Sequence, residues 1–189
     1  MKKLVIFASG SGSNFQAIID AIARNELEAQ IAGLITNRDE TGAAGRAISN
    51  NIPVTVIKDS DPVMLNEKLE AQLSAWNPDL IILAGFLNKI PDKIVRKYHG
   101  RIINIHPSLL PKYGGKGFYG RKVHQAVLNS DDKITGCTVH YVNDEYDKGD
   151  IIEQSHVEIH PTDTAEKLAA RVLKAEHQLL PRVIKKLLT

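Results

Sequence analysis

Four short, almost wholly apolar segments in the first half of the chain limit its possible folds more than any other feature. They cover residues 4–8, 31–36, 53–57 and 80–84. Between them, apolar residues recur at spacings of three and four, as at Phe15, Ile18 and Ile22, which is typical of amphipathic helices. Strands that are buried on both faces have such continuous apolar runs. The pattern therefore predicts an α/β protein whose parallel sheet is covered by helices on both faces.

The second half of the chain has a different pattern. A fifth run covers residues 101–105, and two further strand-like segments, 135–142 and 150–159, are separated only by a turn-rich stretch. This arrangement predicts a two-strand antiparallel addition to the sheet. Asp163 and Glu166 have the spacing of a capping box, which predicts the start of a last helix. We see no linker or repeat, so we expect one domain over residues 1–189.

Composition limits the class of partner. The 189 residues carry a net charge of only +2, which gives no reason to expect nucleic acid or an acidic membrane as a partner. The single cysteine, Cys137, excludes an internal disulfide and is compatible with a reducing compartment. No segment approaches the roughly 20 apolar residues of a membrane span. We therefore expect a soluble, cytoplasmic protein, and the sequence leaves open whether it forms a homo-oligomer.

A glycine–serine turn at residues 9–14 (SGSGSN) follows the first predicted strand and precedes the first helix. Glycine lets the backbone approach a ligand closely, and the free N–H groups of a helix N-terminus favour an anion such as phosphate. The dinucleotide fingerprint fails because Phe15 stands at its third glycine position, and the P-loop lysine is absent. The alternative interpretation is a tight turn in which Ser13 caps the helix.

Asn104 and His106 form the second candidate site. They are two residues apart in a predicted strand, so their side chains share one face. His106 can carry a proton near neutral pH, and Asn104 can donate a hydrogen bond to a developing oxyanion, a combination that suits acyl transfer to an amine. The alternative is a pair of hydrogen-bonded residues at a strand end. The acidic loop that ends at Asp150 lacks the spacing of a calcium loop, and no Cys/His cluster suggests zinc, so we expect no metal.

These segments together resemble the glycinamide ribonucleotide formyltransferases of the folate-dependent formyltransferase superfamily. The resemblance runs nearly end to end, and its motifs are SGSGSN at 9–14, LAGF at 83–86, NIHPSLLPKY at 104–113, GCTVH at 136–140 and DKG at 147–149. It implies a Rossmann-like sheet, with nucleotide binding in the N-terminal half and catalysis and folate binding in the C-terminal half. The implied reaction moves the formyl group of 10-formyltetrahydrofolate to the amine of glycinamide ribonucleotide, a step of purine biosynthesis.

The resemblance also implies roles for individual residues. Asn104 would hold the formyl oxygen, His106 would stabilise the tetrahedral intermediate, and Asp147 would orient His106 and favour its charged form. The substrate phosphate would lie against Gly12, Ser13 and Asn14, with Glu176 near the ribose. The expected folate-binding residues are Leu87, Asn88, Lys89, Ile90, Asn143, Asp144 and Glu145.

The chain departs from the family pattern at two places. The family often has Arg-Ile-Leu where this chain has Asn88, Lys89 and Ile90, so we expect backbone rather than side-chain contacts to the pteridine. The segment 114–120 is longer than in many members, and its glycines suggest a mobile flap. His124 is the nearest histidine that could contribute to the site from this region.

Three rival functions share parts of this pattern. The formyltransferase that acts on initiator methionyl-tRNA normally has a further C-terminal domain, whereas this chain ends at Thr189, and its charge does not favour tRNA. The formyltetrahydrofolate hydrolase uses the same trio with water as acceptor, and usually has a further N-terminal domain. A catalytically silent nucleotide-binding module would leave the trio without a role. Folate-dependent turnover distinguishes these possibilities.

Overall fold

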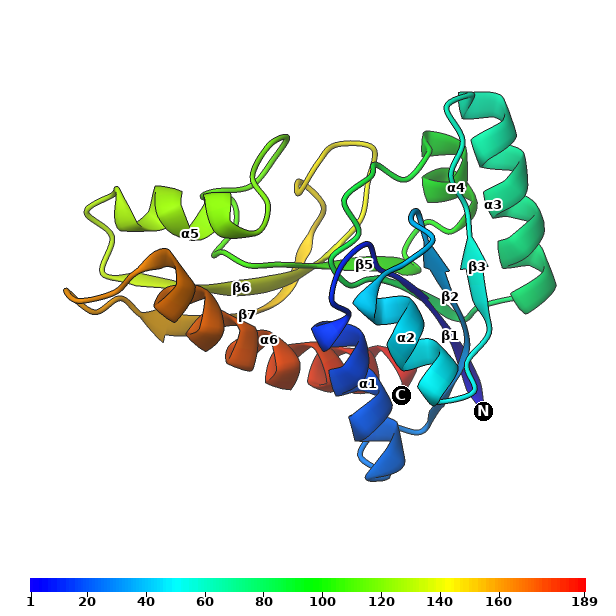
Figure 1. Ribbon diagram of the computed structural model, residues 1–189, viewed down its shortest axis with the longest axis horizontal. Coiled ribbons are helices and arrows are strands. Elements are labelled where there is room, and N and C mark those ends of the chain that lie inside the picture. The colour runs from blue at the N-terminus through cyan, green and yellow to red at the C-terminus, as the bar shows by residue number, and fades with distance from the viewer.

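A computed structural model describes all 189 residues. The chain forms one mixed sheet with helices on both faces (Figure 1). The strands are β1 (Lys2–Phe7), β2 (Ala29–Thr36), β3 (Val54–Val56), β4 (Leu80–Leu83), β5 (Ile102–His106), β6 (Ile134–Tyr141) and β7 (Ile151–Glu158). The helices are α1 (Ser13–Ala23), α2 (Gly42–Ser49), α3 (Pro62–Trp76), α4 (Asp92–Lys97), α5 (Arg121–Leu128) and α6 (Ala165–Leu188). None of them combines the length and the hydropathy that crossing a membrane requires.

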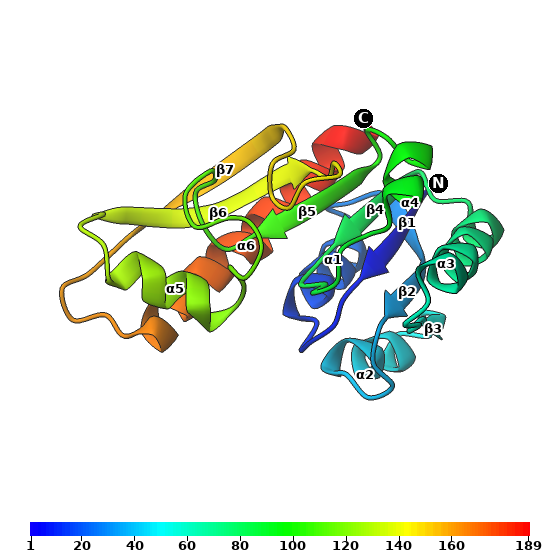
Figure 2. The ribbon, with the colours of Figure 1, turned by 90° about the horizontal axis from the view of Figure 1, so that it is seen from above.

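The sheet has the order β3-β2-β1-β4-β5-β6-β7. Its first five members are parallel, whereas β6 pairs antiparallel with β5 and β7 antiparallel with β6. The predicted parallel sheet with an antiparallel addition is confirmed. The strand order reverses at β1, which lies between β2 and β4 (Figure 2). In an open α/β sheet, ligands bind beyond the carboxyl ends of the strands near such a point.

Two apolar cores lie on opposite faces of the sheet. Alternate residues of β1 divide between them: Leu4 and Ile6 pack with residues of α1, α2 and α6, and Val5 and Phe7 pack with residues of α3 and α4. This division explains why β1 has no polar residue after Lys3, since both of its faces are buried. The longest helix, α6, runs beneath β6 and β7 and reaches α1 (Figure 1).

The last helix begins one residue later than the predicted capping box requires. The Thr164 hydroxyl caps the helix by accepting a hydrogen bond from Lys167 N at 3.3 Å. Asp163 is not the cap because its carboxylate accepts hydrogen bonds from the Arg171 guanidinium, at 2.7 Å to Nη1. The sequence pattern assigns the Asp163 side chain to the cap. That side chain instead bonds to Arg171, two turns further along the helix.

The close contact of β6 with β7 at Gly136 gives a test of this packing. A Cβ at Gly136 would lie 1.9 Å from Ser155 O, whereas a Cβ at Gly45 on α2 would meet nothing within 4 Å. We expect Gly136→Ala to lower the free energy of unfolding by roughly 1–3 kcal/mol, because the backbone must shift. The control, Gly45→Ala, should raise it by roughly 0.5–1 kcal/mol through helix propensity. Urea unfolding measures both changes. An unchanged free energy of unfolding in the Gly136→Ala variant would contradict the close pairing of β6 with β7.

Candidate active site

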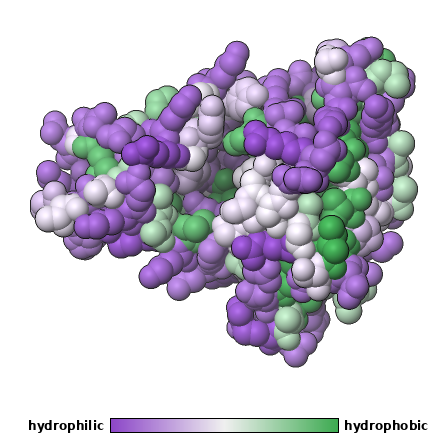
Figure 3. Space-filling model, viewed as in Figure 1, coloured by the Kyte–Doolittle hydropathy of each residue, from purple (hydrophilic) through white to green (hydrophobic).

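A cavity of about 750 Å³ opens at the carboxyl ends of the central strands. The turns after β1 and β4, the end of β5, the loop before α5, the loop after β6 and one side of α6 line it. The space-filling view shows this face of the molecule hollowed near its middle, with hydrophobic residues inside the hollow (Figure 3). Its size is that of a typical small-molecule site, and it lies where the topology predicts one.

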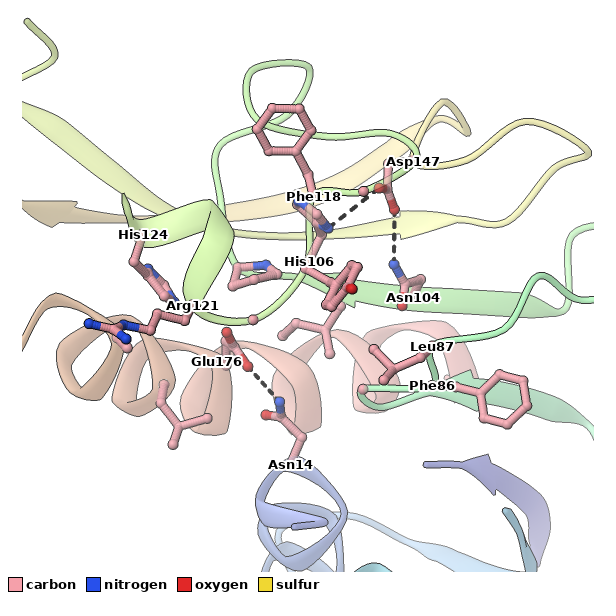
Figure 4. Close-up of a pocket in the computed structure, with 18 of the residues that line it drawn as sticks. Asn14, Phe86, Leu87, Asn104, His106, Phe118, Arg121, His124, Asp147 and Glu176 are labelled. Carbon is pink, nitrogen blue, oxygen red and sulfur yellow. Dashed lines mark hydrogen bonds and ion pairs between the residues drawn. The ribbon is translucent and has the colours of Figure 1, made fainter. Parts of the chain in front are cut away.

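The predicted trio lies together at this cavity (Figure 4). His106 Nδ1 is 3.6 Å from Asp147 Oδ2, an ion-pair distance rather than a hydrogen bond. The other ring nitrogen, Nε2, donates to Tyr113 O at 2.8 Å. Asn104 Nδ2 is 3.4 Å from Asp147 Oδ1. The carboxylate of Asp147 thus lies between the two residues that the strand alternation places on one face.

The backbone explains how these side chains meet. Asn104 and His106 are alternate residues of β5, and they pair in register with His140 and Thr138 of β6. Asp147 arrives from the loop between β6 and β7, with a left-handed backbone (φ 55°). Gly115 N donates to Asp147 Oδ2 at 2.9 Å, so the loop before α5 also holds the carboxylate in place.

Burial and charge act against each other at His106. Burial lowers the pKa of His106 below its ordinary value, and the nearby Asp147 carboxylate offsets this only in part. Burial also tends to raise the pKa of Asp147, but the hydrogen bonds and charges of His140, His106 and Gly115 N bring it below its ordinary value. Asp147 therefore stays ionised and favours charge on His106, although burial outweighs that effect on His106.

Two further histidines lie at this site: His124, which the sequence analysis named as a candidate, and His140, to which it gave no role. His140 is 2% exposed, and its Nε2 is 3.1 Å from Asn104 Nδ2. His124 is 5% exposed, lines the cavity and has no partner at Nδ1. Burial, and then the charge of His106, lower the pKa of His124. Thr138 and His140 are alternate polar residues in an otherwise apolar strand, and this pattern could have identified His140. Its partner on β5 cannot be identified from the sequence.

The glycine–serine turn forms one end of the cavity. Gly12 has φ 72° and is itself the cap of α1, so the alternative in which Ser13 caps the helix is wrong. Asn14 lines the cavity, and its Nδ2 donates to Glu176 Oε2 at 2.5 Å. Burial raises the pKa of Glu176 to about 7. Ser13 lies outside the cavity, beside a shallow hollow that Arg46 also lines.

Most of the residues expected to bind folate gather at the other end. Leu87 lines the large cavity. A smaller cavity of about 70 Å³ adjoins it and is lined by Asn88, Lys89, Ile90, Asn143 and Glu145. The two cavities share Phe86, Asn104, Tyr146 and Asp147, so this end is continuous with the trio. Asp144 lines neither cavity.

Comparisons with known proteins agree with this geometry. The formyl transferase family matches residues 2–184. A chloroplastic phosphoribosylglycinamide formyltransferase of Vigna unguiculata is 44% identical over 98% of the chain. The chain spans 61% of the length of that relative and 64% of the Arabidopsis thaliana relative of the same name.

Solved structures show the same relationship. Glycinamide ribonucleotide transformylase 1 of Geobacillus kaustophilus superimposes with a TM-score of 0.93 and 37% identity, with each chain fully covered. A formyltetrahydrofolate deformylase of Pseudomonas syringae has a TM-score of 0.87 at 26% identity, over 97% of this chain and 60% of its own. The family match covers nearly the whole chain, and the relatives share its sheet. The chain belongs to the formyl transferase family.

Proposed function

We propose that the chain transfers the formyl group of 10-formyltetrahydrofolate to the amine of glycinamide ribonucleotide, a step of purine biosynthesis. One observation carries the proposal: Asn104, His106 and Asp147 meet at a cavity that has an anion-favouring turn at one end and a mainly apolar recess at the other. The names of the relatives support the choice of the nucleotide, and formyltetrahydrofolate in the name of the Pseudomonas syringae deformylase supports the choice of the formyl donor.

The nucleotide would enter at the end formed by α1 and α6. The first N–H groups of α1 have no partner within the helix, and with the positive end of the helix dipole they favour a phosphate. Gly12 suits this role because its Cβ position is already filled by Ala43, so the turn packs tightly. Ser13 and Asn14 would supply further contacts to the phosphate. Glu176, held by Asn14 at 2.5 Å, would accept hydrogen bonds from the ribose hydroxyls.

The folate would enter at the other end, between residues 87–90 and 143–145. Phe86 and Tyr146 line both cavities and offer ring faces to a flat heterocycle. The smaller cavity, about 70 Å³, is tighter than a pteridine requires, so these two loops would have to separate on binding. The amide and carboxylate groups of Asn88, Asn143, Asp144 and Glu145 are the candidate polar partners on these loops.

The chemistry follows from where the trio lies. The neutral amine would attack the formyl carbon, forming a new C–N bond and an oxyanion. The His106 Nε2–H, which donates to Tyr113 O, would instead donate to that oxyanion. Collapse of the intermediate would break the bond to N10 of the folate, while the amine loses one proton and N10 gains one. Asp147 would hold the ring and stabilise its positive charge.

Hydrolysis of the same folate is the second candidate, because the Pseudomonas syringae deformylase has this fold. Such an enzyme needs no nucleotide. The turn at Gly12 and the buried pair Asn14–Glu176 favour the transferase, since a hydrolase has no use for a phosphate site at that end.

The proposal includes small-molecule substrates alone, without nucleic acid or membrane, and a cytoplasmic location. The charge of +2 and the single cysteine support it.

Release of tetrahydrofolate tests the proposed reaction. Purified protein should release it from 10-formyltetrahydrofolate only when glycinamide ribonucleotide is present. His106→Ala and Asp147→Asn should each lower kcat by roughly a hundredfold or more, because one removes the oxyanion donor and the other its charge partner. The exposed His156 offers a matched control, and His156→Ala should retain the wild-type rate. Release of tetrahydrofolate without the nucleotide would show that the chain is a hydrolase. Full activity of the His106→Ala variant would show that His106 has no part in the mechanism.

The raised pKa of Glu176 predicts how stability depends on pH. The folded pKa, about 7, lies above the ordinary value of 4.5, so the folded state binds the proton more tightly than the unfolded state. Stability from this group is complete below about pH 4.5 and is lost as the pH rises through 7. Wild type should therefore lose up to roughly 3 kcal/mol relative to Glu176→Gln across this window. Urea unfolding from about pH 5 to about pH 8 measures it, and a constant difference would contradict the assignment.

A further inference from the structure

Helix α2 packs against the glycine–serine turn of residues 9–14, beside α1 (Figure 1). Ala43 N donates to Gly10 O at 3.1 Å, and Arg46 Nε donates to Ser11 O at 2.9 Å. Two successive carbonyl oxygens of the turn are thus bonded to one helix. The proposed reaction uses this turn to bind the phosphate of the nucleotide, but it gives α2 no role.

The N–H groups of the same turn have no such partners. Gly10, Ser11 and Gly12 donate to no backbone carbonyl of the chain, and the first N–H groups of α1 have no partner within the helix. Gly12 O accepts from Gln16 N at 2.9 Å, which is the first bond of α1. The carbonyls of residues 10–12 are therefore all bonded to the protein, whereas the N–H groups remain for a ligand. A phosphate needs this polarity, because its ionised oxygens accept hydrogen bonds and repel a carbonyl oxygen.

The turn does not fix this polarity by itself. Glycine adopts both signs of φ at little cost, so the peptide between Ser11 and Gly12 is free to rotate. A half rotation would direct the carbonyl toward the phosphate and the N–H group away from it. Helix α2 prevents this by its close approach, since a Cβ at Gly42 would lie 2.7 Å from Ser11 O. The Arg46 guanidinium then holds that oxygen by a charge-assisted hydrogen bond.

Arg46 also brings positive charge to the turn. Its Nη1 donates to Gln16 Oε1 at 3.0 Å, so one guanidinium joins α2 to both the turn and α1. These two partners are neutral, and no carboxylate forms an ion pair with Arg46. Arg24, which lines the same shallow hollow as Arg46 and Ser13, instead pairs with Glu26 at 2.8 Å. A guanidinium without a carboxylate partner, next to a row of free N–H groups, favours an anion.

We propose that Arg46 is a positioning residue for the phosphate of the nucleotide. It holds the Ser11 carbonyl away from the phosphate, so that the N–H groups of the turn face the phosphate, and its positive charge adds to the attraction. This inference rests on the proposed function. The phosphate lies at the end of the substrate away from the reacting amine. The role should therefore appear in the KM of the nucleotide, and not in kcat or in the KM of the folate.

Three substitutions test this division. We expect Arg46→Met to raise the KM of the nucleotide about tenfold, with kcat and the folate KM within about twofold of wild type. Arg46→Lys keeps the charge but not the planar fork, so it should recover only part of the loss. The control, Arg24→Met, removes a charge from the same hollow and should leave the nucleotide KM within about twofold. An unchanged KM in Arg46→Met, or full recovery in Arg46→Lys, would overturn the proposal.

A pair of glycines on α2 tests the same contact with Arg46 in place. A Cβ at Gly42 would displace Ser11 O, whereas a Cβ at Gly45 would meet nothing within 4 Å. We expect Gly42→Ala to raise the KM of the nucleotide several-fold and Gly45→Ala to leave it unchanged. Equal KM values in the two variants would show that α2 does not position the turn.

The phosphate itself separates positioning from general damage to the site. Glycinamide riboside, the same substrate without its phosphate, should have equal kcat/KM values with wild type and Arg46→Met. Equal losses with the nucleotide and the riboside would overturn the proposal. Calorimetric titration with ribose 5-phosphate needs no turnover, and its Kd should rise about tenfold in Arg46→Met. If wild type shows no nucleotide-dependent turnover, the proposed function fails, while this titration still decides the role of Arg46.

Discussion

The antiparallel pairing of β5 with β6 is the constraint on which the site depends. It places Asn104 and His106 opposite His140 and Thr138. The Thr138 hydroxyl donates to Ser108 O at 2.7 Å and accepts from Leu110 N at 3.1 Å, which holds the turn that follows β5. A slip of β6 by one residue would turn His140 and Thr138 to the face opposite Asn104 and His106. The alternate polar residues of β5 and β6 therefore form one site only because the register of the two strands is fixed.

Burial then gives these polar groups their chemical character. His106 and Glu176 are both largely removed from water, and each has its pKa shifted toward the neutral form. Asp147 is the exception, because it receives a hydrogen bond from Gly115 N and faces two histidines, so it stays ionised. One fixed negative charge among groups that readily gain or lose a proton is the arrangement expected where a proton must move during acyl transfer.

The sequence predicts the sheet well because its signals are local. The apolar runs identify the parallel strands, and the spacing of Asn104 and His106 identifies one side of the site. The contacts that complete the site are not local. The pairing of His140 with Asn104 depends on strand register, and the capture of Asp163 by Arg171, which moves the cap to Thr164, depends on a side chain eight residues away. The hydrogen bond of Asn14 to Glu176 joins residues 162 positions apart. Patterns of residue type cannot encode such partners, and Glu176 was named as a candidate only through the family resemblance.

In the proposed reaction the formyl group passes directly between two substrates held in one cavity. The single thiol, Cys137, is buried, and burial raises its pKa to about 12, so it is not a candidate to carry the formyl group. Initial rates measured while both substrates are varied test the claim most directly. We expect double-reciprocal plots that intersect, because the folate and the nucleotide must be bound together. Parallel plots, the kinetic mark of a formyl-enzyme intermediate, would contradict it.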